Sequence, residues 1–96
     1  MNSQDVVLKL KELKPIIAAR YKVREISLFG SFVRGEQKEN SDIDLLAEFD
    51  ENADLIDLIG LELYLEDIFQ RPVDIVPKQA LRAELRETIL QQVVVI

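Results

Sequence analysis

Cysteine and histidine are both absent from the 96-residue sequence. Without cysteine, the chain can form no disulfide bond and offers no thiolate as a zinc ligand or nucleophile. Without histidine, it lacks the residue that most often serves as a general base and as a ligand of transition metals. Any catalytic chemistry must therefore rest on carboxylates, hydroxyl groups, lysine, arginine or a bound ion.

Long apolar segments are also missing. No run approaches the roughly 20 apolar residues that a membrane-spanning helix needs. The N-terminal stretch MNSQDVVLKLKELK lacks the basic start and apolar block of a signal peptide. Since a domain usually contains roughly 100 residues or somewhat more, we expect residues 1–96 to form a single domain. We also expect a cytoplasmic protein with no membrane segment.

An excess of positive charge is the third absence, since the formal net charge is −6. Proteins that hold nucleic acid by its phosphates are usually basic, so we do not expect direct nucleic-acid binding. A small anion could still bind in a locally positive pocket or through a bridging cation.

Hydrophobic periodicity predicts alternating helices and strands. The apolar residues Val6, Leu10, Leu13 and Ile17 recur at helical spacing, and Pro15 should kink or split that helix. In chain order, the predicted elements are a helix over 4–21, a strand over 23–29, a polar loop over 30–41, a strand over 42–49, a helix over 55–69, a strand over 73–76 and a helix over 79–92. This αβ(loop)βαβα order predicts an α/β (α+β) domain in which helices pack on a small mixed three-stranded sheet.

Two segments carry more apolar residues than a single core face can hide. The predicted helix over 55–69 is apolar around most of its circumference, and the sequence ends in VVVI at 93–96. These residues could contact another protein, complete the core or form a homo-oligomer. The sequence leaves these alternatives open.

The stretch LFGSFVRGEQKENSDIDLL, residues 28–46, contains two of the three glycines. Gly30 directly follows an apolar strand, where glycine lets the backbone approach a ligand and expose N–H groups to phosphate oxygens. Ser31 adds a hydroxyl donor, and Arg34 adds a permanent cation. An ordinary strand-to-helix turn with a solvated arginine would have the same sequence, so the loop alone decides nothing.

A pair of carboxylates follows this loop. Asp42 and Asp44 are two residues apart on a predicted strand, so their side chains share one face at about 7 Å spacing. Such hard oxygen ligands suit Mg²⁺ or Mn²⁺. Asp74, in the middle of the strand over 73–76, is the candidate third ligand of a two-metal site. Alternatively, that strand is an edge strand and Asp74 is simply solvated.

Considered together, GSFVRG at 30–35 and SDIDL at 41–45 resemble the signature of the polymerase beta-like nucleotidyltransferase fold. More narrowly, they resemble the minimal nucleotidyltransferase (MNT) proteins. The order of elements and the third carboxylate strand are similar as well, so the resemblance covers nearly the whole chain. Val33 departs from the pattern, because a small residue such as alanine is more usual there.

The resemblance implies a role for each motif residue. Gly30 and Ser31 would hold the β- and γ-phosphates of ATP, with Arg34 steadying the loop or the triphosphate. Asp42 and Asp44 would bind two Mg²⁺ ions, which Mn²⁺ could replace. Asp74 would bind the catalytic ion and orient or deprotonate the attacking hydroxyl group. The implied reaction transfers a nucleoside monophosphate to a hydroxyl and releases pyrophosphate.

The resemblance also implies a partner. MNT proteins are often encoded beside a HEPN-domain ribonuclease toxin, and some act as antitoxins that modify a tyrosine of that toxin with AMP. Two alternatives remain open: an antitoxin that acts by contact alone, and a nucleotidyltransferase for a small-molecule hydroxyl.

Three cations at the start of the last predicted helix and just before it form one further pattern. Lys78, Arg82 and Arg86 are four residues apart and would share one helical face. A solvated charged face explains this spacing. The cations could also meet an acidic partner surface, and Lys78 could reach a triphosphate.

Overall fold

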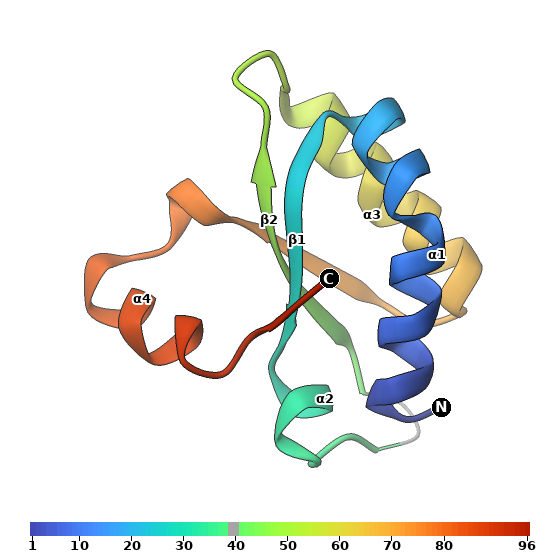
Figure 1. Cartoon of the computed structure of the whole chain (residues 1–96), viewed down its shortest axis with the longest axis vertical. Coiled ribbons are helices and arrows are strands. Elements are labelled where there is room, and N and C mark those ends of the chain that lie inside the picture. The colour runs from blue at the N-terminus through green and yellow to red at the C-terminus, as the bar shows by residue number, and fades with distance from the viewer. Residues whose placement is uncertain (39–40) are drawn as a thin grey trace.

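The computed structural model describes residues 1–38 and 41–96. The elements, shown in Figure 1, are α1 (Ser3–Tyr21), β1 (Val23–Phe29), α2 (Ser31–Arg34), β2 (Ile43–Phe49), α3 (Leu55–Phe69), β3 (Val73–Pro77), the 3₁₀ helix η1 (Lys78–Ala80), α4 (Ala83–Leu90) and β4 (Val94–Val95). The predicted order of the major helices and strands is confirmed. The predicted loop over 30–41 begins with the single turn α2, and residues 39 and 40 of that loop lie outside the described residues.

The strands form one mixed sheet in the order β3-β2-β1-β4. Strand β2 lies antiparallel to β1 and parallel to β3, while β4 runs antiparallel to β1. The predicted mixed sheet is confirmed, but it has four strands rather than three. Val94 and Val95 pair with Leu28 and Ser27. A strand this short has no periodicity of its own, so only its partner β1 defines it.

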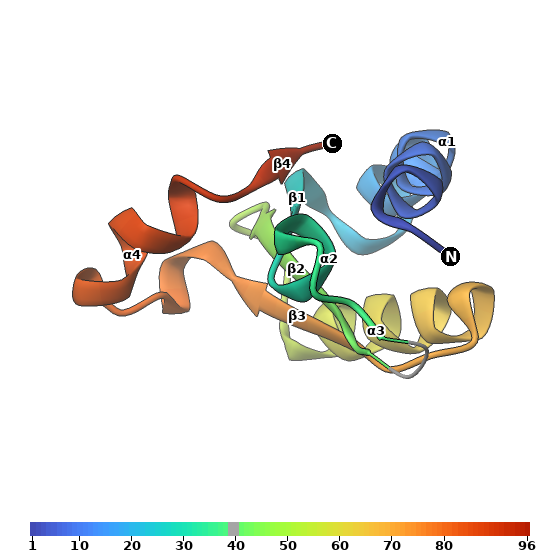
Figure 2. The ribbon, with the colours of Figure 1, turned by 90° about the horizontal axis from the view of Figure 1, so that it is seen from below.

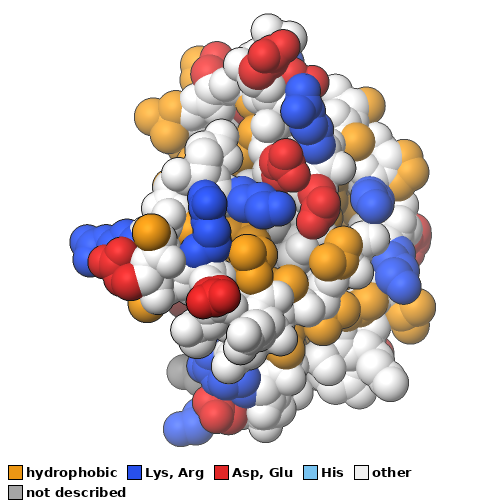
Figure 3. All heavy atoms as spheres, turned by 60° about the vertical axis from the view of Figure 1, so that its left-hand side comes forward, with side chains coloured by type: hydrophobic (Ala, Val, Ile, Leu, Met, Phe, Trp, Pro, Cys, Tyr) orange, Lys and Arg blue, Asp and Glu red, His pale blue; other side chains and the backbone are white. Residues whose placement is uncertain are grey.

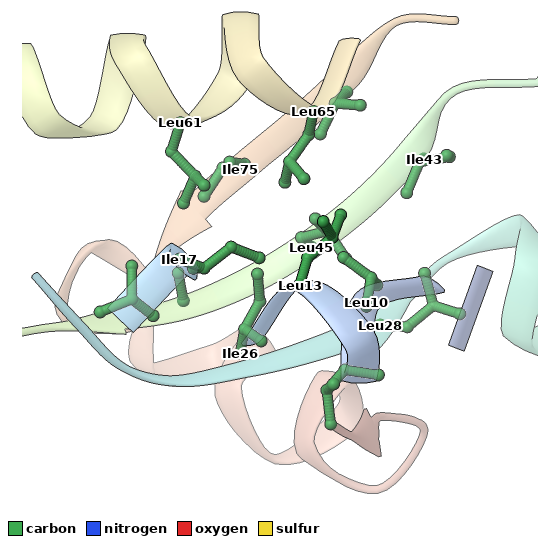
Figure 4. Packing of buried hydrophobic residues seen from close by; sticks show 14 of the residues in the cluster. Leu10, Leu13, Ile17, Ile26, Leu28, Ile43, Leu45, Leu61, Leu65 and Ile75 are labelled. Atoms are coloured by element: carbon green, nitrogen blue, oxygen red, sulfur yellow. The ribbon is translucent and has the colours of Figure 1, made fainter. Parts of the chain in front are cut away.

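The hydrophobic core lies on one face of this sheet. Figure 2 shows α1 and α3 side by side on that face and α4 on the opposite side. In Figure 4, Leu61 and Leu65 of α3 point toward the strands, and Leu10 and Ile17 of α1 contribute from the neighbouring helix. No helix among the described residues is both long and apolar enough to cross a membrane.

Helices α1 and α3 begin with the same capping arrangement. The Asn2 side chain accepts the N–H of Asp5 at 2.9 Å, and the Asp54 side chain accepts the N–H of Asp57 at 3.1 Å. In each case the acidic partner accepts the backbone N–H of the cap in return. Such reciprocal capping satisfies N–H groups that a helix start leaves free, and it confirms the predicted start of α3.

Two helices differ in part from the prediction. Helix α1 is not split, because it continues through Pro15 to Tyr21. Pro15 is exposed, so water can reach the carbonyl that loses its helical partner. The predicted last helix over 79–92 is instead divided into η1 and α4, because Leu81 and Arg82 have extended backbone angles.

Candidate functional site

A cleft of about 570 Å³ opens between the sheet and α4. No residue of α4 is buried, so this helix stands away from the sheet and does not seal the face that it covers. Residues from β1, α2, β2, β3 and α4 line the cleft. Figure 3 shows charged side chains of both signs gathered around apolar ones on the side of the molecule that carries α4.

Two carboxylates lie side by side on the sheet wall of this cleft. Asp44 of β2 is in register with Phe29 of β1 and with Asp74 of β3. Neighbouring strands are about 4.8 Å apart, and both aspartates line the cleft. Strand β3 is an edge strand and Asp74 is exposed, as the edge-strand alternative predicted. Asp74 nevertheless lies beside Asp44, as a shared site requires.

Gly30 brings the backbone directly against Asp44. Its φ of 80° and ψ of −150° fall in a region that is essentially restricted to glycine. A Cβ atom built at this position would overlap the carboxylate of Asp44. The absence of a side chain therefore permits the end of β1, the start of α2 and the Asp44 carboxylate to meet at one point.

The surroundings of Asp44 disfavour its negative charge. Burial is the largest factor that raises the pKa of Asp44, followed by the negative charges of Asp74 and Asp42, while Arg34 opposes them. Arg34 also lines the cleft, although its Nε donates to the Glu36 carboxylate at 3.2 Å. The cleft therefore favours a cation or a proton near Asp44.

Two predicted site residues lie at the margin of the cleft rather than in its lining. Asp42 is exposed just before β2, close enough to raise the pKa of Asp44. Ser31 is half-buried in the first turn of α2, where its carbonyl accepts the N–H of Glu36 at 3.0 Å. The predicted residues that line the cleft together are Gly30, Arg34, Asp44 and Asp74.

The described residues do not form a ready-made metal cage. Within residues 1–38 and 41–96, no group of three or more acidic side chains is arranged to hold a metal ion. Mg²⁺ is commonly held by one or two carboxylates, with phosphate oxygens and water completing its shell. Asp44 and Asp74 fit that pattern chemically, with Asp42 nearby, so a metal ion that arrives with a phosphorylated ligand suits this donor set.

Sequence reasoning missed the residue that secures α2. The guanidinium carbon of Arg71 lies 5.3 Å from the ring centre of Phe32, and its Nη1 donates to the carbonyl of Ser41 at 3.3 Å. Arg71 therefore ties α2 to the start of β2 from the far end of α3. No local pattern indicates this contact, because its partners are about 30 to 40 residues away in the sequence.

The α4 side of the cleft was also missed. Leu81, Leu85 and Ile89 line it, and in the sequence their four-residue spacing indicates only one face of a helix. Lys78, Arg82 and Arg86 do not share one helical face as predicted, because the chain is extended at Arg82. Of these three cations, only Arg82 lines the cleft. Lys78 instead lies 3.9 Å from the Glu48 carboxylate.

Several known proteins are similar to this chain in sequence or in fold. The nucleotidyltransferase domain family matches residues 10–96. The protein adenylyltransferase MntA of Thermococcus cleftensis is 43% identical over 95 residues, which cover 92% of this chain and 96% of that protein. A solved structure provisionally described as a minimal nucleotidyltransferase superposes with a TM-score of 0.84 and 34% identity, over 98% of this chain and 95% of the other. A toxin–antitoxin crystal structure with AMP-PNP includes a similar chain, with a TM-score of 0.70 and 26% identity over 99% of this chain and 72% of that one.

Proposed function

The chain belongs to the nucleotidyltransferase domain family, as a protein adenylyltransferase of the MntA type, and from this premise we propose that it transfers AMP from ATP to a hydroxyl group of a partner protein. One observation carries the proposal: Gly30, Asp44 and Asp74 meet at one end of a cleft in a chain of this family. The toxin–antitoxin structure with AMP-PNP, an ATP analogue, supports ATP as the donor.

In the proposed reaction, the acceptor hydroxyl oxygen attacks the α-phosphorus of ATP. The bond from that phosphorus to the bridging oxygen breaks, and pyrophosphate leaves. Asp74 is exposed at the edge of the sheet, where it can orient the incoming hydroxyl group and accept its proton. Gly30 and Ser31 hold the β- and γ-phosphates, and Arg34 adds positive charge beside them.

Asp42, Asp44 and Asp74 are the proposed holders of two Mg²⁺ ions, which Mn²⁺ could replace. When bound, the metal supplies positive charge that polarises the phosphate and stabilises the leaving group. The raised pKa of Asp44, caused first by burial and then by Asp74 and Asp42, supports this assignment. A cation between the carboxylates would remove the repulsion that raises this pKa.

The exposed face of α3 supports a protein as the acceptor. Leu55, Ile56, Ile59 and Leu63 are 66%, 78%, 47% and 61% exposed, and large exposed apolar patches commonly mark interfaces. Every ionisable side chain of α3 is acidic or a tyrosine, so two copies of this helix would repel each other. We therefore favour a different partner, a HEPN-domain toxin whose tyrosine receives AMP, with this chain acting as its antitoxin.

Calorimetric titration of ATP tests the nucleotide site. We expect binding that requires Mg²⁺ and is lost in the double variant Asp42→Asn/Asp44→Asn. The matched control is Glu48→Gln/Asp50→Asn, which removes two charges at the same spacing farther along the chain and should retain binding. Unchanged ATP affinity in the Asp42/Asp44 variant would contradict the proposed site.

Transfer from α-labelled ATP to a co-purified HEPN protein tests the acceptor. Label should appear on the toxin with the wild-type chain and with the Glu48/Asp50 control, but not with the Asp42/Asp44 variant. If that variant neutralises the toxin as well as the wild type does, neutralisation acts by contact alone and the enzymatic role is wrong.

A further inference from the structure

Helix α4 and the extended residues just before it form an apolar wall on one side of the cleft, and no other part of the described chain covers this wall. Leu81, Leu85 and Ile89 line the cleft from this side, and Val76 of β3 lines it from the sheet. Leu85 is 49% exposed, and no residue of α4 is buried. Apolar side chains of a helix usually pack against the core, so the open wall is a surface suited to an apolar ligand group.

Polar groups flank this wall. Thr88 and Gln92 also line the cleft, and their hydroxyl and amide groups can both donate and accept hydrogen bonds. Arg82 lines the cleft immediately before α4 begins. Among residues 1–38 and 41–96, its side chain has no hydrogen bond or ion pair, unlike Arg34, which is bonded to Glu36.

The cleft thus has two chemically different parts. The sheet end carries Gly30, Asp44 and Asp74, which suit metal-bound phosphates. The α4 side carries the apolar wall and Arg82. A nucleoside triphosphate has the same two-part chemistry: an anionic phosphate chain joined to a flat base whose edges carry donors and acceptors. Because both parts belong to one cleft, a nucleoside triphosphate is the class of ligand that fits it.

We propose that α4 and the two residues before it form the nucleoside subsite of the cleft, where the base packs on Leu81, Leu85 and Ile89 while Arg82 binds the phosphate chain. Thr88 and Gln92 then lie where they can bond the edges of the base. The inference rests on the proposed function, because it places the same ATP. It adds a helix that lies outside the glycine and aspartate motifs.

The first test separates the base from the phosphates. Titrations in Mg²⁺ compare ATP with inorganic tripolyphosphate, which lacks a nucleoside. Leu85→Ala should weaken ATP binding about tenfold, as expected when an apolar contact of this size is lost, and should change tripolyphosphate binding less than about twofold. The matched control is Leu90→Ala, because Leu90 is 38% exposed on the same helix and does not line the cleft.

The second test concerns the cation. Arg82→Gln should weaken both ATP and tripolyphosphate about tenfold, the size expected for one charged hydrogen bond to a phosphate. Arg86→Gln removes the same charge one turn away, outside the cleft lining, and should change both affinities less than about twofold. If Arg82→Gln and Arg86→Gln weaken binding equally, the affinity depends on the overall positive charge of this region. That result would contradict a specific contact between Arg82 and the phosphates.

The outcomes distinguish this inference from the proposed function. If the wild-type chain binds ATP and loses it in Asp42→Asn/Asp44→Asn, yet Leu85→Ala and Arg82→Gln bind normally, the α4 subsite is wrong and the nucleotide site stands. The apolar residues of α4 would then be candidates for contact with the acceptor protein instead. If the wild-type chain binds neither ligand, with or without its partner, both proposals are overturned. Circular dichroism spectra confirm that each variant is folded.

Discussion

Asp44 is surrounded by other functional groups of the cleft. Its carboxylate lies against the backbone of Gly30, in register with Asp74 and near Asp42. Burial and these like charges disfavour its ionised form, while Arg34 favours it. In the absence of a metal ion, the charge of Asp44 therefore works against folding near neutral pH.

We predict that Asp44→Asn stabilises the metal-free chain at pH 7. The pKa of Asp44 is raised on folding, so the stability linked to this group is fully present below its ordinary pKa and is lost as pH rises through the raised pKa. Thermal unfolding in EDTA should give a higher Tm for the variant at pH 7. The difference should vanish near pH 3, where the wild-type carboxyl is protonated.

The control for this experiment is Glu51→Gln, which neutralises an exposed carboxylate in the turn after β2 and should leave Tm nearly unchanged. A lower Tm for Asp44→Asn than for the wild type at pH 7 would show that the Asp44 charge is stabilising in the folded chain. The electrostatic description of the cleft would then be wrong.

Among the elements, α3 and β3 depend on each other most directly. Strand β3 is at the edge of the sheet, where outward N–H groups need partners. The Val73 N–H donates to the Glu66 carboxylate of α3 at 3.0 Å. One turn earlier, burial raises the pKa of Glu62, the Ile75 N–H lowers it, and Asp74 and Glu66 raise it. The Glu66 carboxylate therefore joins the end of α3 to the first residue of β3.

We predict that Glu66→Ala destabilises the chain by about 1–3 kcal/mol, because the part-buried Val73 N–H loses its acceptor. Glu66→Gln keeps an acceptor oxygen and should cost clearly less. Urea unfolding curves of the two variants and the wild type provide the measurement. If alanine and glutamine cost the same, the hydrogen bond to β3 contributes nothing and only the charge matters.

In the whole molecule, the two faces of the sheet are covered to different degrees. The face under α1 and α3 is closed by the hydrophobic core, whereas the face under α4 holds an open cleft. Charged residues can face the cleft because solvent reaches it. The outer side of α3 adds an apolar surface that the core does not use.

We predict that neighbouring leucines of α3 behave differently on truncation. Leu65→Ala should cost about 2–5 kcal/mol in unfolding free energy, because Leu65 is fully buried. Leu63→Ala should cost about 0.5 kcal/mol or less, because Leu63 is 61% exposed. Urea unfolding of the chain alone makes the comparison. A large loss for Leu63→Ala would mean that this surface completes a fold or an oligomer of the chain itself.

The sequence by itself determined the order of the major elements, the mixed sheet and the family. Periodicity and caps such as Asp54 are local signals, so β1 and α3 were predicted with the bounds that the structure shows. The motif residues Gly30, Asp42 and Asp44 lie close together in the sequence, and they were identified for the same reason.

Tertiary structure decided what depends on distant contacts. The pairing of Val94 with Leu28 makes a fourth strand, and Arg71 reaches Ser41 across 30 positions. Asp74 lies beside Asp44 because β2 and β3 are parallel and in register, and no local pattern determines register. Leu81, Arg82 and Leu85 line the cleft because the chain is extended between η1 and α4 and so holds α4 off the sheet.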